Sequence, residues 1–153
     1  MKLYIFVMLL LVSFATQGSE WAHNAINLTH EYGDGSGVKV GVLDGPVRCS
    51  HQELSGRCKN IFYDGEVKRG NHATHVATII AGKDQAPDWM DHDGGVAPRA
   101  KIYSYQVFEA NDYWISDENE VDMANKAARD GVSIINMSYG AYNEHGRAAL
   151  IDS

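Results

Sequence analysis

The chain has 153 residues, of which 44% are hydrophobic and 22% are charged. This length and composition suffice for one hydrophobic core and are too small for two ordinary domains. The formal net charge is −7, and no run of Lys or Arg is dense enough to form the positive surface that nucleic-acid binding requires. The composition therefore argues against nucleic acids and anionic membrane surfaces as partners.

Residues 1–18 predict a secretory signal peptide. Lys2 is followed by an apolar run from Leu3 to Phe14 and then by small residues, so cleavage after Ala15 or after Gly18 fits the pattern. A bilayer-spanning helix needs about 20 apolar residues, and no segment of the chain reaches that length. We therefore expect a protein that is secreted, periplasmic or at the cell surface, with no membrane contact beyond its signal peptide. An uncleaved membrane anchor is the alternative.

Regular elements are expected to alternate along the rest of the chain. In chain order, the patterns predict a glycine-rich loop at 33–37, a buried strand at 38–45, a strand at 60–64, a helix at 72–82, a strand at 101–108, a helix at 116–131 and a buried strand at 132–140. Ser116 or Asp117 can cap the second helix, and Gly131 ends it. Near-continuous apolar strands separated by helices favour the α/β class, with a doubly wound parallel sheet.

Cys49 and Cys58 close a short loop after the first of these strands. In an oxidising compartment two nearby thiols usually pair, so we expect a disulfide. Such a bridge would stabilise the fold by about 2 to 3 kcal/mol on the chain-entropy model. The alternative is a pair of free buried thiols.

Functional residues of a doubly wound sheet gather at the carboxyl ends of its strands. Asp44 directly follows the first apolar strand run, and Ser138–Gly140 follows the last. His72 and His75 lie three residues apart at the head of the first predicted helix. No Glu lies between the two histidines, and no third His or Cys follows at the spacing of a zinc ligand. The pair is therefore only weak evidence for a zinc site. A small secreted metal-binding protein stays open as one candidate function.

Four segments occur in the order seen in subtilisin-like serine proteases, and the resemblance covers about residues 21–140. They are Asp44 at the end of its strand, "HATHVATIIAG" at 72–82, "GGVAPRAKIYSYQVF" at 94–108 and "DGVSIINMSYG" at 130–140. The second segment resembles the family's HGTHVAGxIAG helix, and the last resembles its INMSxG strand end. The resemblance implies that residues 21–153 are the N-terminal part of a subtilisin-like peptidase domain, whose C-terminal half is incomplete.

The resemblance also implies a role for each residue of the predicted site. His72 is expected to be the general base, and Asp44 the carboxylate that orients its imidazole and stabilises the imidazolium. His75 is expected to be a helix residue that packs under the site. Ser138, Tyr139 and Gly140 are expected to bind an extended polypeptide substrate by backbone pairing, with Tyr139 lining the first specificity pocket.

Three residues depart from the family pattern near these positions. Gly45 and Pro46 replace the usual Ser or Thr followed by Gly, and Pro46 removes one backbone donor. Ala73 replaces the glycine that usually follows the catalytic histidine. We expect these changes to be tolerated, and a weakened site is the alternative.

The reaction implied by the resemblance requires no cofactor, but acidic residues suggest calcium. Glu53 stands where family members often place a calcium-ligating Asp. Four further carboxylates follow in one irregular loop, at Asp84, Asp88, Asp91 and Asp93. A solvated acidic loop without bound metal is the commoner alternative. The "NLT" at Asn27 also fits an N-glycosylation acceptor, if the host glycosylates.

Two parts of a subtilisin-like active site have no counterpart in the sequence: the GTSMA-like turn with the nucleophilic Ser, and the oxyanion-stabilising Asn. We therefore expect a secreted serine endopeptidase in lineage, of which this chain is a truncated form that is inactive alone. Its missing partner would be the C-terminal half of its own domain, and without that half we expect low stability and aggregation. The alternative is a catalytically inert exported peptide-binding module.

Overall fold

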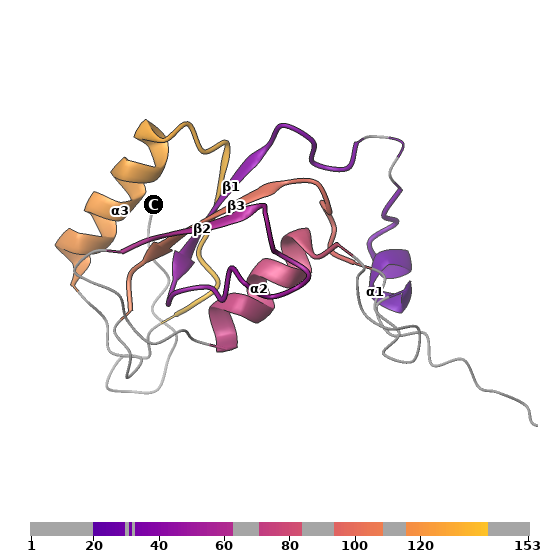
Figure 1. The fold of residues 1–153 in the computed structure, drawn as a ribbon, viewed down its shortest axis with the longest axis horizontal. Coiled ribbons are helices and arrows are strands. Elements are labelled where there is room, and N and C mark those ends of the chain that lie inside the picture. The colour runs from indigo at the N-terminus through magenta and orange to yellow at the C-terminus, as the bar shows by residue number, and fades with distance from the viewer. Residues whose placement is uncertain are drawn as a thin grey trace, which may run out of the picture.

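The computed structural model describes residues 20–29, 31, 33–62, 71–83, 94–108 and 116–140. In chain order their elements are α1 (Glu20–Ala25), β1 (Lys39–Asp44), β2 (Cys58–Ile61), α2 (Asn71–Ala81), β3 (Lys101–Gln106), α3 (Asp117–Arg129) and β4 (Ile134–Asn136) (Figure 1). The predicted signal peptide lies outside the described residues. No helix in the described part is long and apolar enough to cross a bilayer.

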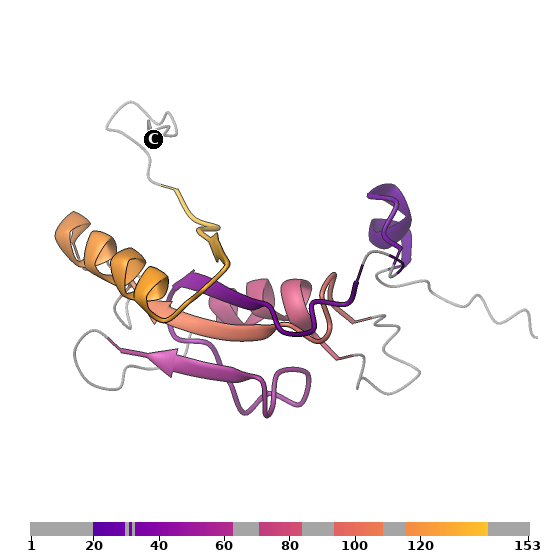
Figure 2. The same ribbon diagram turned by 90° about the horizontal axis from the view of Figure 1, so that it is seen from above.

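The four strands form one sheet in the order β2-β3-β1-β4, and every neighbouring pair is parallel. Figure 2 shows β2 and β4 at the two outer positions, with β3 and β1 between them. Val40 of β1 pairs with Ile102 on one side and with Ile134 on the other. The predicted α/β class with a parallel sheet is confirmed.

The sheet is covered on both faces, because alternate side chains of its buried strands point to opposite sides. On one face Val42 and Ile102 pack in a cluster with Ala77 of α2. On the other face Leu43 and Tyr105 pack with α3. Figure 1 shows the two helices on opposite sides of the strands. This doubly covered arrangement is why β1 is buried at every position after Lys39, and β3 at four of its six positions.

The boundaries of α3 follow from its sequence. The Ser116 side chain accepts a hydrogen bond from the backbone N–H of Asn119 at 3.2 Å, so the prediction of a cap at Ser116 is confirmed. Three acidic residues lie in the first turn and Lys126 and Arg129 in the last, which suits the helix dipole. Gly131 follows with φ 71°, a conformation that glycine adopts without strain.

Other elements differ from their predicted extents. The strand predicted at 60–64 begins at Cys58, because Cys58 already pairs with Ile102 of β3. The strand predicted at 132–140 pairs only over Ile134–Asn136, and it lies at the outer position next to β1. Helix α1 was not predicted, since six residues are too few to show a helical period.

Candidate functional site

Asp44 and His72 are brought together at the carboxyl end of β1. Asp44 is the last residue of that strand, and His72 is the second residue of α2. The Nδ1 atom of His72 lies 2.8 Å from Oδ2 of Asp44. The pairing follows from the fold, because α2 packs across the face of the sheet onto which the Asp44 side chain points.

One backbone donor holds the carboxylate of Asp44, and another holds the main chain of the same residue. Its Oδ1 accepts a hydrogen bond from the N–H of Gly45 at 2.6 Å, and its main-chain oxygen accepts one from Val107 at 2.9 Å. The side chain is only 7% exposed. A buried carboxylate is costly unless it is hydrogen-bonded, and here the Gly45 N–H satisfies one oxygen while His72 lies against the other.

The His72 imidazole has the opposite environment, since its side chain is 60% exposed. A carboxylate next to Nδ1 assigns the proton of the neutral ring to that nitrogen. Nε2 then carries the lone pair and can accept a proton from a second group. A fixed acid behind an accessible base is the geometry that general-base catalysis requires.

His75 does not pack under the site, and that expectation is wrong for the described structure. Helix α2 buries Ala73, Val76, Ala77 and Ala81, whereas His75 is exposed. A residue three positions after His72 lies on nearly the same side of the helix, and that side faces outward. In the part of the chain that the structure describes, no group of three or more His, Cys, Asp or Glu side chains could hold a metal ion.

The segment Ser138–Gly140 follows β4 on the other side of β1. The Ser138 hydroxyl donates to Oδ1 of Asn136 at 2.8 Å. The Tyr139 ring packs edge-on against Phe108, with centroids 5.1 Å apart, and its hydroxyl donates to Glu120 at 2.6 Å. The Tyr139 side chain is therefore held towards α3, which leaves the backbone of the segment as its accessible part.

The ends of β1 and β4 lie side by side, because the two strands pair in parallel up to Val42 and Asn136. Burial raises the pKa of the Tyr139 phenol, and the hydrogen bond to Glu120 raises it further. The charge of Asp44 acts on the same phenol in the same direction. Asp44 and Tyr139 thus belong to one edge of the sheet, as the rule for parallel sheets predicts.

The three departures from the family pattern are accommodated in different ways. A Cβ atom at Gly45 would meet nothing within 4 Å, so the Ser or Thr of the family pattern would find room there. Pro46 is fully buried, and so is Ala73, whose methyl group belongs to the core under α2. The methyl group at position 73 therefore fills core volume and does not crowd His72.

Glu53 is buried, but it belongs to no group of three or more acidic, His or Cys side chains in the described residues. Calcium prefers six to eight oxygen ligands, so the described residues alone do not make a calcium site at this position. The charge of Glu53 opposes the larger effect of burial, which lowers the pKa of Arg57. The four aspartates at 84–93 lie outside the described residues. Asn27 is exposed, with φ 57°.

The loop between β1 and β2 carries the predicted disulfide and several contacts that the sequence did not reveal. The disulfide joins Cys49 to Cys58, so that prediction is confirmed. Within the same loop, Val47 hydrogen-bonds to side chains of β2 and β3, and the backbone N–H of Arg48 donates to Thr74 of α2 at 2.9 Å. The only signal in the sequence was a polar residue inside an apolar strand, Ser104, which is 1% exposed.

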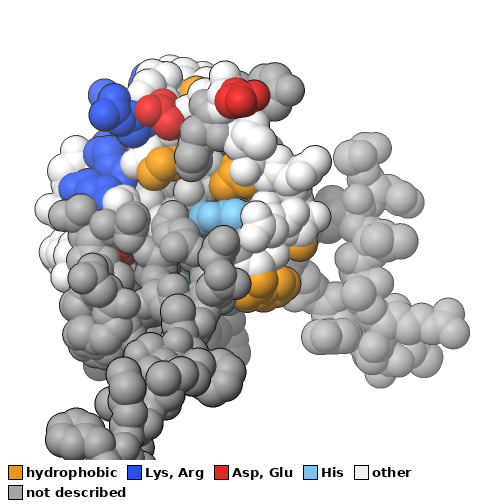
Figure 3. Space-filling model, turned by 90° about the vertical axis from the view of Figure 1, so that its right-hand side faces the viewer, with side chains coloured by type: hydrophobic (Ala, Val, Ile, Leu, Met, Phe, Trp, Pro, Cys, Tyr) orange, Lys and Arg blue, Asp and Glu red, His pale blue; other side chains and the backbone are white. Residues whose placement is uncertain are grey.

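A hollow lies at the opposite end of the strands, away from Asp44 and His72. It is lined by Asp34, Arg57, Lys83, Pro98 and Arg99. Arg57 bonds three main-chain oxygens there, those of Glu53, Ala81 and Ala100, and Arg99 pairs with Asp34 at 3.3 Å. Figure 3 shows Lys and Arg side chains gathered on one flank of the molecule. Through these hydrogen bonds Arg57 connects the starts of β2 and β3 to the end of α2, which is a structural role.

Comparison with known proteins agrees with this geometry. The model of the subtilase family matches residues 35–150. Subtilisin DY from Bacillus licheniformis is 32% identical over 109 residues, which cover 69% of this chain. Subtilisin-like protease 3 from Pseudogymnoascus destructans is 31% identical over 132 residues, which cover 76% of it.

Among solved structures, fervidolysin from Fervidobacterium pennivorans, described as a keratinolytic enzyme related to subtilisin, matches with a TM-score of 0.67 and 26% identity over 80% of this chain. The chain spans only part of each of these proteins: 38% of subtilisin DY, 29% of subtilisin-like protease 3 and 20% of the fervidolysin chain.

Proposed function

Because the chain belongs to the subtilase family, we propose that Asp44 and His72 are the acid and base of a secreted serine endopeptidase that cleaves extended polypeptides. One observation carries the proposal: a buried, hydrogen-bonded carboxylate lies 2.8 Å from the Nδ1 atom of an exposed imidazole. No other pair in the described residues combines a fixed acid with an accessible histidine in this way.

Each residue has a defined part in the reaction. His72 takes the proton of a serine hydroxyl at Nε2, which makes the serine nucleophilic, and later returns the proton to the leaving amine. Asp44 keeps the other ring proton on Nδ1 and stabilises the imidazolium that forms. The backbone of Ser138–Gly140 pairs with the substrate as an added strand, and the anchored Tyr139 side chain keeps this segment in place.

We propose that the 153-residue chain is inactive by itself. Its sequence has no GTSMA-like turn, and it covers well under half of the relatives that it matches. We propose that the nucleophile and the oxyanion donor come from the C-terminal half of the same domain. The intact mass of the natural product tests this, because a value well above 16.9 kDa is expected.

Activity of the natural product tests the roles of the two residues. A fluorophosphonate probe should label it, and Asp44→Asn should lower peptide hydrolysis by about 10⁴-fold, as in other Ser-His-Asp enzymes. His72→Ala should have an effect at least as large, whereas His75→Ala, on the same exposed side of α2, is the matched control and should retain activity. Full hydrolysis by the His72→Ala protein would refute the proposal.

Export is proposed from the pattern of residues 1–18 alone. Sequencing the N-terminus of the mature protein should find a start after Ala15 or after Gly18. A mature protein that begins at Met1 would refute cleavage.

A second candidate is a peptide-binding module that has lost its chemistry. The replacements at Gly45, Pro46 and Ala73, next to the acid and the base, are the observation that favours it. A folded natural product that binds peptides but resists the fluorophosphonate probe would select this candidate over the peptidase.

A further inference from the structure

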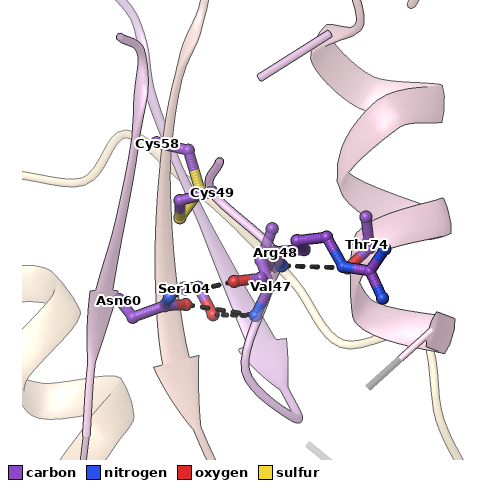
Figure 4. The surroundings of a disulfide bond; sticks show 7 residues. All are labelled: Val47, Arg48, Cys49, Cys58, Asn60, Thr74 and Ser104. Carbon is purple, nitrogen blue, oxygen red and sulfur yellow. Dashed lines mark hydrogen bonds between the residues drawn. A yellow bond between two sulfur atoms is a disulfide. The ribbon is translucent and has the colours of Figure 1, made fainter. Parts of the chain in front are cut away.

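We propose that Thr74 is a positioning residue for His72: it ties the first turn of α2 to the loop that follows Asp44. This inference rests on the proposed function, because it concerns how the same Asp44–His72 pair is held. It adds a residue that neither contacts substrate nor takes part in proton transfer. Figure 4 shows the residues that carry it.

The loop after Asp44 is fixed first at Val47. The N–H of Val47 donates to both Oδ1 of Asn60, at 3.1 Å, and Oγ of Ser104, at 3.2 Å. The Asn60 amide returns a hydrogen bond to the main-chain oxygen of Val47 at 2.9 Å. Val47 and Ser104 are buried, so water does not compete for these bonds. The loop is therefore locked onto β2 and β3 only three residues after Asp44.

The disulfide adds a second fixed point two residues later. Cys49 is bonded to Cys58, the first residue of β2, and Arg48 lies between the two fixed points. The backbone N–H of Arg48 consequently has a set position and direction. It points at Oγ1 of Thr74, 2.9 Å away, as the dashed line in Figure 4 shows.

Thr74 lies two residues after His72 in the first turn of α2. Core packing of Ala73 holds this turn against the sheet, but it does not fix the turn relative to the loop that follows Asp44. The bond from Thr74 to that loop, which is itself locked to the sheet, adds this connection next to the contact between His72 and Asp44. The two bonds join residues 44 and 48 of one segment to residues 72 and 74 of the other, and so set where the imidazole meets the carboxylate.

The test measures the tautomer of His72 directly and needs no enzymatic activity. Nitrogen-15 NMR of the full chain, at about pH 9 where free histidine is neutral, gives the ratio of the Nδ1–H to the Nε2–H form of each imidazole. We expect Asp44 to hold His72 in the Nδ1–H form. Thr74→Val and Thr74→Ala, which both remove the acceptor, should lower this ratio by about threefold, as suits one partly exposed hydrogen bond.

Two variants are matched controls. Thr74→Ser keeps the oxygen and should keep the ratio. Thr78→Val removes a hydroxyl one turn further along α2, where Oγ1 donates to the main-chain oxygen of His75, and should also keep it. The tautomer ratio of His75 should stay constant in every sample, since that residue is exposed on the same helix.

The outcomes separate this inference from the proposed function. If Asp44→Asn leaves the His72 ratio unchanged, the acid–base pair does not form, and the proposed function and this inference fail together. If the ratio depends on Asp44 but not on Thr74 in folded variants, only the positioning role fails. If both Thr74 variants lose their folded amide spectrum, the role is also overturned, because Thr74 would then serve general stability.

Discussion

Two isoleucines flank Val40 in the sheet at the same register, Ile102 on β3 and Ile134 on β4. Ile102 is fully buried, whereas Ile134 is 57% exposed. The two residues have the same side chain, the same strand geometry and the same central neighbour. The difference between them lies in what covers the strand: β3 is covered by helices and by β2, while β4 is the outer strand of the described sheet.

The same contrast separates the two strand ends that form the candidate site. On the β3 side, Asp44 is buried and its main-chain oxygen is bonded by Val107, which follows β3. On the β4 side, Ser138 is exposed and bonds its near neighbour Asn136. The acid of the site is therefore part of the core, and the segment proposed to bind substrate is part of the surface. This difference suits a fixed catalytic group and a surface that must accept a peptide.

The largest expected effect comes from making the same change on both sides of Val40. Ile102→Ala should lower the free energy of unfolding by about 2 to 5 kcal/mol, because it leaves a cavity in a closed core. Ile134→Ala should lower it by less than about 1 kcal/mol, since much of that side chain is already in water. Urea unfolding of the two variants measures both values. Equal losses would show that β4 is as well covered as β3.

An intermediate effect is expected in alkaline solution. Burial raises the pKa of the Tyr105 phenol on β3, and its hydrogen bond to Asp130, 2.9 Å long, raises it further. The native state keeps this proton above pH 10, whereas the unfolded chain loses it near that pH. The stabilisation is therefore complete below about pH 10, and is lost by about 1.4 kcal/mol per pH unit as the pH rises further.

Tyr105→Phe should remove this part of the pH dependence, so that the unfolding free energy falls less steeply between about pH 10 and 11.5. Tyr139→Phe, after β4, should flatten the curve by a similar amount, because burial and the bond to Glu120 also raise the pKa of that phenol. Urea unfolding at several pH values measures both slopes. An unchanged slope in Tyr105→Phe would contradict the buried environment assigned to β3.

Substitutions at the β4 edge should change the free energy of unfolding least. They should clearly change self-association of the chain. Ile134, Ile135 and Met137 are exposed there, and in the described sheet no strand pairs with the outer side of β4. Open apolar edges promote pairing with other chains. We expect the chain to self-associate with concentration in sedimentation velocity, and Ile135→Lys to reduce this while changing the unfolding free energy by less than about 0.5 kcal/mol.

Val121→Lys is the matched control for that experiment. Val121 is an exposed apolar residue on α3, away from the edge strand. Its replacement should leave self-association unchanged. An equal reduction by both variants would assign the effect to added charge and not to the β4 edge.

Much of this organisation could be predicted from local patterns. The apolar run before Asp44 placed that residue at a strand end, and parallel pairing predicted that Ser138–Gly140 lies at the same edge of the sheet. The helical spacing placed His72 at the start of a helix, but its meeting with Asp44 was implied only by the family resemblance. Exposure could not be predicted in the same way, because Ile134 and Ile102 look alike in sequence. The tie between Arg48 and Thr74 was also invisible, since it uses a backbone donor whose direction is set by a loop 26 residues away.

The strand order has a consequence for synthesis of the chain. Strand β1 appears first but pairs only with β3 and β4, which begin at Lys101 and Ile134. At translation rates of about 5 to 20 residues per second, the segment Lys39–Asp44 waits roughly 3 to 12 seconds for its first partner. During that interval it is an unpaired apolar segment, which makes the nascent chain a candidate client for chaperones that hold extended polypeptides.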